Sequence, residues 1–167
     1  MLTRGLFRGK DSRDGDMDTD TIEFTSNTSL KYPKAFSEAG MSQTAIRYIP
    51  ETGETGDEIY LMRYETMFAT CQSFNPMEVM LEPTRFGNLY VVAKGNINEN
   101  RSNGFSLVGF NLQYKNADMD LWADEWDACQ GLTPGLLPTA VKIELFFMDY
   151  LGAIHHFVTS VEIPPRT

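Results

Sequence analysis

The sequence lacks the residues from which most catalytic and metal sites are built. Only two histidines, His155 and His156, and two cysteines, Cys71 and Cys129, occur among 167 residues. The cysteines form no C-x-x-C pair, so the ligands of a structural zinc site are missing. Adjacent histidines on a strand point to opposite faces of the sheet, so the pair is not suited to one metal ion or one proton relay. The sequence therefore predicts no catalytic residue, no metal site and no cofactor.

Long apolar runs and an excess of positive charge are missing as well. No window approaches the roughly 18 consecutive apolar residues of a membrane helix, and the first residues contain no apolar segment of signal-peptide length. The 23 acidic residues outnumber the 14 basic ones, which gives a formal charge of −9. That charge repels nucleic acid and anionic lipid headgroups, so we expect neither as a partner. A protein or a polycation is compatible with it.

The two cysteines leave two interpretations open. A disulfide between Cys71 and Cys129 would close a long loop and would stabilise the fold by a few kcal/mol in an oxidising compartment. A pair of buried free thiols is the other interpretation.

The sequence does contain a series of strand-like runs. With 42% hydrophobic residues, 167 residues suffice for one domain with a core. Thr21 to Ser26 alternates Ile22 and Phe24 with polar residues, which is the period of a half-buried strand. Hairpin-length connections predict that the strands pair mostly antiparallel. Helix is expected only as one turn at residues 34–40 and, as an alternative to strand, at residues 77–83.

Two later runs have well-defined faces in this interpretation. Between Gly104 and Lys115, alternation predicts one face with Leu107 and Asn111 and an opposite face with Phe110, Leu112 and Tyr114. The closing segment, residues 140–163, is predicted to be a hairpin. Its first arm places on one face Val141, Ile143, Leu145 and Phe147.

An acidic run precedes the first of these strands. Asp14, Asp16, Asp18 and Asp20 stand at alternate positions, and spaced carboxylates in a loop often supply the six to eight oxygen ligands of calcium. The EF-hand pattern fails, because Gly15 is in the wrong place and no glutamate closes the loop. We interpret the run as a solvated acidic loop or linker and leave calcium binding open.

A second acidic segment carries both tryptophans. Trp122 and Trp126 stand beside Asp124, Glu125 and Asp127, a composition that carbohydrate-active proteins also use. A glycosidase needs its two carboxylates roughly 5–9 Å apart across a cleft, and adjacency in the sequence does not provide this. We interpret the tryptophans as apolar lids that fold the segment onto the sheet.

Four segments, in this order, resemble the soluble domain of a minor pseudopilin of bacterial type II secretion, the J-type subunit. The first is the strand TIEFTS, and the second is Ala45 to Glu65, in which Tyr48, Leu61 and Arg63 match recurring residue types. The third, residues 110–127, contains W-x-x-x-W. The fourth, residues 137–164, contains LP-x-A-V and then D-x-x-G.

The resemblance implies an α+β fold, predominantly antiparallel β: a pilin-like head domain whose N-terminal hydrophobic helix is missing here. Residues 1–20 would then be the remnant of the helix end plus an acidic linker, and residues 21–167 a single β-rich globular domain. The implied function is not enzymatic. It is assembly at the tip of the pseudopilus, where the subunit binds the I- and K-type minor pseudopilins and supports protein export across the outer membrane.

The resemblance also implies a location. A hydrophobic helix would anchor the full-length protein in the inner membrane of a Gram-negative bacterium, with the head in the periplasm, where a Cys71–Cys129 bridge would be permitted. Two alternatives stay open: a minor pilin of a type IV pilus, and an extracellular carbohydrate- or ligand-binding β module.

Overall fold

The computed structural model describes residues 7–26, 44–52, 58–66, 88–96, 106–116, 121–129 and 137–164. Every regular element in these ranges is a β-strand, and the sheets are antiparallel. The predicted α+β, pilin-like fold class is therefore wrong. Its helical part came from the family resemblance and not from any apolar period of 3.6 residues. The helical turn predicted at residues 34–40 and the ambiguous segment 77–83 lie outside the described residues.

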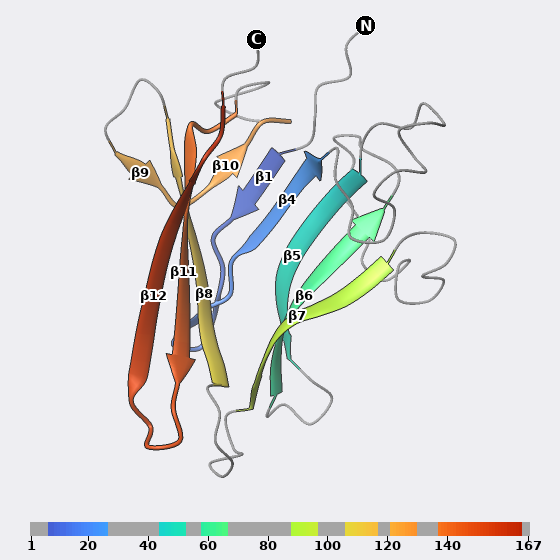
Figure 1. Ribbon diagram of the computed structural model, residues 1–167. Coiled ribbons are helices and arrows are strands. Elements are labelled where there is room, and N and C mark those ends of the chain that lie inside the picture. Colours follow the sequence, from blue (N-terminus) through green and yellow to red (C-terminus); the bar gives the residue numbers. More distant parts are fainter. Residues whose placement is uncertain are drawn as a thin grey trace, which may run out of the picture.

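Twelve strands lie in the described ranges (Figure 1). In chain order they are β1 (Phe7–Lys10), β2 (Arg13–Asp14), β3 (Met17–Asp18), β4 (Thr21–Ser26), β5 (Thr44–Thr52), β6 (Glu58–Thr66), β7 (Asn88–Asn96), β8 (Ser106–Lys115), β9 (Trp122–Ala123), β10 (Trp126–Asp127), β11 (Ala140–Met148) and β12 (Ile154–Glu162). A six-stranded sheet has the order β10-β1-β4-β5-β6-β7, a four-stranded sheet has the order β12-β11-β8-β9, and β2 pairs with β3. Figure 1 shows the two large sheets as two layers.

The core lies between these layers. Phe7, Ile22 and Leu61 of the six-stranded sheet share one buried cluster with residues of β8 and β11. Two sequence predictions are confirmed here. Strand β4 has the predicted bounds, and the predicted face of β11 packs on the core through Val141, Ile143, Leu145 and Phe147.

Residues 7–20 contain the strands β1, β2 and β3, whereas a helix end and an acidic loop or linker are predicted there. Strand β1 pairs with β4 on one side and with β10 on the other. The acidic run is a tight hairpin in which β2 and β3 flank Gly15 and Asp16. Gly15 has a φ of 62°, which glycine adopts at little cost, and glycine at the first central position suits a two-residue hairpin turn.

Asp20 connects this hairpin to the four-stranded sheet. Its side chain is only 1% exposed. One carboxylate oxygen accepts the N–H of Ser12 at 3.1 Å, and the other accepts the N–H of Leu112 in β8 at 2.7 Å. The N–H of Asp20 in turn donates to the carbonyl oxygen of Phe110 at 3.0 Å. Burial raises the pKa of Asp20 to about 6, against the lowering effect of the two backbone donors.

Tyr114 makes the second close contact between the sheets. Its ring is fully buried and packs edge-on against Phe7, with 6.0 Å between the ring centroids. The ring lies so close to Gly9 of β1 that a Cβ there would come within 2.0 Å of the ring carbon Cζ. Its hydroxyl is buried and has no hydrogen-bond partner among the described residues. Burial raises the pKa of Tyr114, and the nearby charge of Asp20 raises it further.

Strand β8 interrupts the predicted alternation with a bulge. Between the pairings of Phe146 and Phe147 the register shifts by one residue, which leaves Val108 as the extra residue. Leu107, predicted to share a face with Asn111, is instead fully buried in the core.

The contact between Gly9 and Tyr114 predicts that Gly9→Ala is strongly destabilising. The new methyl group has to displace a fully buried ring, and we expect the free energy of unfolding to fall by about 1–3 kcal/mol or more. Tyr114→Phe is the control, because it removes only the unpaired hydroxyl, and we expect it to be neutral or stabilising by about 1 kcal/mol. Urea unfolding measures both changes, and a Gly9→Ala protein as stable as the wild type would contradict the contact.

Asp20 predicts a pH dependence of stability. Because its pKa is about 6 in the folded state and 3.8 ordinarily, the folded protein holds this proton more tightly than the unfolded chain. The free energy of unfolding therefore falls as the pH rises through this interval, by up to about 1.4 kcal/mol per pH unit. Unfolding at several pH values is compared for the wild type and Asp20→Asn. The Asp20→Asn variant should lack this pH-dependent contribution to the free energy of unfolding. It should also be less stable than the wild type at low pH, because its one amide oxygen faces two N–H donors. Parallel pH profiles would contradict the assignment.

Candidate interaction surface

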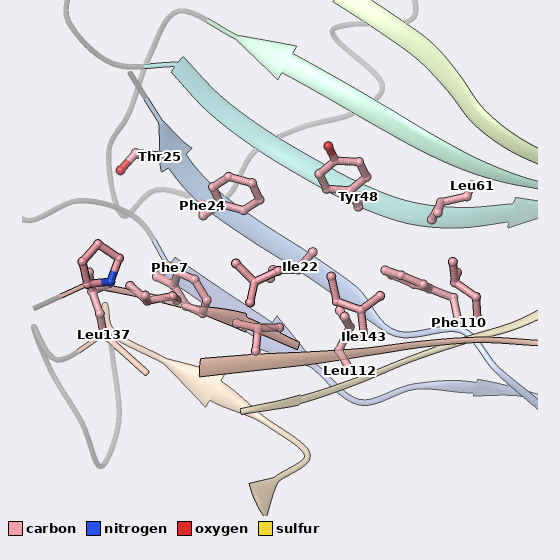
Figure 2. A pocket seen from close by; sticks show the side chains of 15 residues that line it. Phe7, Ile22, Phe24, Thr25, Tyr48, Leu61, Phe110, Leu112, Leu137 and Ile143 are labelled. Carbon is pink, nitrogen blue, oxygen red and sulfur yellow. The ribbon is translucent and has the colours of Figure 1, made fainter. Parts of the chain in front are cut away.

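An apolar groove of about 720 Å³ lies between the two large sheets. Figure 2 shows side chains from both sheets facing each other across it, among them Phe24 and Tyr48 on one side and Ile143 on the other. The lining residues are Phe7, Ile22, Phe24, Thr25, Tyr48, Leu61, Phe110, Leu112, Leu137, Val141, Ile143, Leu145, Val161, Ile163 and Pro164. None of these is a carboxylate, histidine, lysine or cysteine. The described lining of the groove therefore offers shape and apolar contact.

The closing hairpin, β11 and β12, is shaped by Asp149. One of its carboxylate oxygens accepts the N–H groups of Leu151 and Ala153, both at 2.9 Å, and the other lies 2.8 Å from Nε2 of His155. The hydrogen bond to His155, followed by that from Ala153, holds the pKa of Asp149 below its ordinary value. Gly152 has a φ of 83°, which favours glycine. The D-x-x-G motif thus builds a turn of defined geometry.

This hairpin carries most of the large apolar side chains that are exposed among the described residues. Nine large apolar side chains are exposed in the described part of the chain, and six of them belong to β12 and its turn. Their exposed fractions range from 52% to 76%. The six are Tyr150, Leu151, Ile154, Phe157, Val158 and Val161. Grouped exposed apolar residues mark surfaces that contact another molecule more often than scattered ones do.

The outer face of the four-stranded sheet carries a polar network centred on Glu144. One of its oxygens accepts a hydrogen bond from Nδ2 of Asn111 at 2.6 Å. The other lies 3.5 Å from Nζ of Lys142 and 3.6 Å from Nε2 of His156. The ring of His156 also stacks on Phe146, with 4.4 Å between the centroids. Because each polar group already has a partner, we interpret this network as structural.

The four aspartates for which the sequence leaves calcium binding open do not converge on one point. Asp14 and Asp16 are exposed on the hairpin. Asp18 pairs with Arg13 at 3.0 Å, and Asp20 points into the interior toward backbone donors. Among the described residues, no group of three or more histidine, cysteine, aspartate or glutamate side chains is arranged to hold a metal ion.

The two tryptophans have different environments, so the prediction of two lids is only partly correct. Trp126 is 6% exposed and packs on Tyr114 in the core. Trp122 is 37% exposed, and its ring centroid lies 6.0 Å from Nζ of Lys115 and 5.5 Å from Nζ of Lys142. The tryptophans therefore form no common platform for a sugar ring.

The acidic residues near the tryptophans are engaged in local contacts. Asp124 accepts a hydrogen bond from Gln113 at 2.9 Å, whereas Asp127 accepts the N–H of Cys129 at 2.7 Å. Asp127 also lies 3.4 Å from Nε of Arg8. These two carboxylates have structural partners and do not form the facing pair of a glycosidase.

The residues that carry the family resemblance also have structural roles. The guanidinium of Arg63 donates to the hydroxyl of Tyr48 and lies 5.4 Å from the centre of its ring. Leu61 belongs to the core, and Asp149 and Gly152 build the turn. Sequence reasoning did not single out the exposed apolar set. Its signal was the spacing of Ile154, Phe157, Val158 and Val161, which places apolar residues on both faces of one strand.

Comparisons with protein families, curated proteins and solved structures find no match to this chain. The likeness to J-type pseudopilins therefore rests on the sequence motifs alone. A search of the described residues for membrane-spanning helices finds none.

Cys129 lies in a disulfide bond. Its predicted partner, Cys71, lies outside the described residues, so the pairing stays a prediction. Alkylation of the denatured, unreduced protein should leave both cysteines unmodified, and peptide mapping should recover them as one linked peptide. Reduction should lower the free energy of unfolding by about 2–4 kcal/mol. Full alkylation without reductant would contradict the bridge.

Proposed function

We propose that this protein is a non-catalytic assembly subunit of the type II secretion pseudopilus tip. It binds the I- and K-type minor pseudopilins and so supports protein export across the outer membrane. The head domain works in the periplasm, and a hydrophobic helix anchors the full-length subunit in the inner membrane. The family part of this proposal rests on the sequence motifs and not on the fold.

One structural observation supports an assembly role: the concentration of exposed apolar side chains on β12 and its turn. Specific protein interfaces are centred on apolar and aromatic anchors that lose water on binding, with a polar rim around them. Tyr150, Leu151 and Phe157 are exposed anchors of this kind, and the polar residues Lys142 and Glu144 of β11 lie opposite Ser160 and Val158 of β12. Because the bonds of Asp149 hold the turn, these anchors are ordered before a partner arrives, which lowers the entropy lost on binding.

The chemistry of the described side chains supports the non-catalytic part. Catalysis needs a nucleophile or base next to the group that orients it, around a cleft that holds the substrate. The groove is lined by apolar residues, and the carboxylates of Asp20, Glu144 and Asp149 are each bound to structural donors. This arrangement supports a binding role.

The prediction is that Leu151→Ser weakens binding to the soluble domains of the I- and K-type pseudopilins encoded with this chain. Loss of one anchor of an interface should raise the dissociation constant about tenfold. Leu121→Ser is the matched control, because Leu121 is 74% exposed and Leu151 is 76% exposed, yet Leu121 lies outside the hairpin. Calorimetry or surface plasmon resonance measures the affinities.

Two results would count against the proposal. If neither pseudopilin binds the wild-type protein, the assignment to the type II secretion tip is wrong. If both variants bind as the wild type does, the hairpin is not the contact surface. Binding to the subunits of a type IV pilus instead would select that alternative.

A further inference from the structure

The free edges of the two large sheets differ in how well they are protected from pairing. Edge strands expose unpaired backbone groups, and proteins usually shield them by short length, bulges, proline or lysine. Strands β9 and β10 have only two residues each. Strand β7 contains Lys94 and Gly95, and its pairing with β6 shifts register at Val92.

Strand β12 has none of these protections. It is nine residues long and contains no proline, glycine, lysine or arginine. Its pairing with β11 runs without a register shift from Ile154 to Glu162. It ends the strand order of its sheet, and among the described residues it pairs with β11 alone. All of its residues except His155 are exposed. This is the one long, regular edge in the described part of the fold.

The hydrogen bonds at the two ends of the hairpin show which backbone groups face outward. At the turn, the N–H of Asp149 donates to the carbonyl of Ala153, and at the open end the N–H of Ile163 donates to the carbonyl of Thr139. In an antiparallel pair, alternate residues bond to the partner strand and the residues between them point both backbone groups away. Both bonds place the odd-numbered residues toward β11. The outward groups therefore belong to Ile154, His156, Val158, Ser160 and Glu162.

The charge around the β12 edge determines which kind of strand it attracts. Glu144, Asp149 and Glu162 lie on the hairpin, against one cation, Lys142, which is 3.5 Å from Glu144. The whole chain carries a charge of −9. A second copy would bring the same negative charge to the edge, whereas a cationic strand would be attracted.

We propose that β12 adds one β-strand of a different protein, and that this strand carries lysine or arginine beside its apolar residues. The backbone groups of the even-numbered residues hold it by antiparallel or parallel pairing. On the face of the sheet that lines the groove, the apolar residues of the added strand pack beside Phe157 and Val161. On the outer face they pack beside Ile154 and Val158. The inference concerns the mode of contact and does not depend on the partner being a pseudopilin.

The main test compares Ser160→Pro with Ser160→Ala. Both substitutions remove the hydroxyl, but only proline removes the backbone N–H. Because this N–H points away from β11, its loss leaves the hydrogen bonds between β11 and β12 intact. The probe is a capped peptide of the length of β12 in which valine and threonine alternate between terminal lysines. We expect Ser160→Ala to bind it as the wild type does and Ser160→Pro to bind about five- to tenfold more weakly. Far-UV circular dichroism and the unfolding midpoint check that the proline variant is folded.

The same inference is tested by changing the peptide and leaving the protein unaltered. N-methylation of every valine and threonine removes the N–H groups and should abolish binding, and glutamate in place of the terminal lysines should weaken it. Equal binding by Ser160→Pro, by the methylated peptide or by the glutamate peptide would overturn the inference. A wild-type dimer in solution that Ser160→Pro converts to a monomer would also overturn it, because the occupant would then be a second copy.

Discussion

The buried carboxylate of Asp20 is the contact on which the arrangement of the two sheets depends. It accepts backbone N–H groups from Ser12 and from Leu112, residues that are far apart in the chain. Burying a carboxylate is unfavourable unless hydrogen bonds within the protein replace those that it makes with water. The pKa of Asp20 is raised because its two backbone hydrogen bonds compensate only in part for the lost hydration. Both oxygens are used, so the geometry of the β2–β3 hairpin against β8 is strongly restricted. Tyr114, two residues beyond Leu112, then packs directly on Gly9 and sets the spacing of β1 from β8.

Joining the sheets in this way determines the surfaces that remain for binding. The contacts around Asp20 and Tyr114 unite β1, β4 and β8, and the rest of the facing sheets lines the groove with apolar side chains (Figure 2). Strand β12 lies one strand further from the joint than β11, and its apolar residues are therefore only partly covered. The contacts of Asp20 and Tyr114 thus account for both the buried core around β8 and the incomplete cover of the β11–β12 hairpin.

The parts of the fold that depend on local alternation were predictable from the sequence. Strand β4 and the inward face of β11 follow the period of two residues. Strand β1 was not predictable, because its four residues are held as a strand by β4 and β10 and not by their own pattern. The burial of Asp20 depends on Leu112, and the bulge at Val108 depends on pairing with β11, so neither has a local signal. The α+β fold class came from the family likeness, and it was wrong, because the described residues form only strands.

The candidate surface, too, was predictable from the sequence only in part. A sequence shows that β12 is apolar, but only the strand order shows that it lies at an edge, and only the hairpin bonds show which backbone groups point outward. An unprotected edge of this length favours indiscriminate pairing unless something opposes it. Here the charge of −9 opposes the approach of identical copies while it favours a cationic strand. The negative charge from which we expect no nucleic-acid partner therefore also favours the selectivity that an exposed β edge requires.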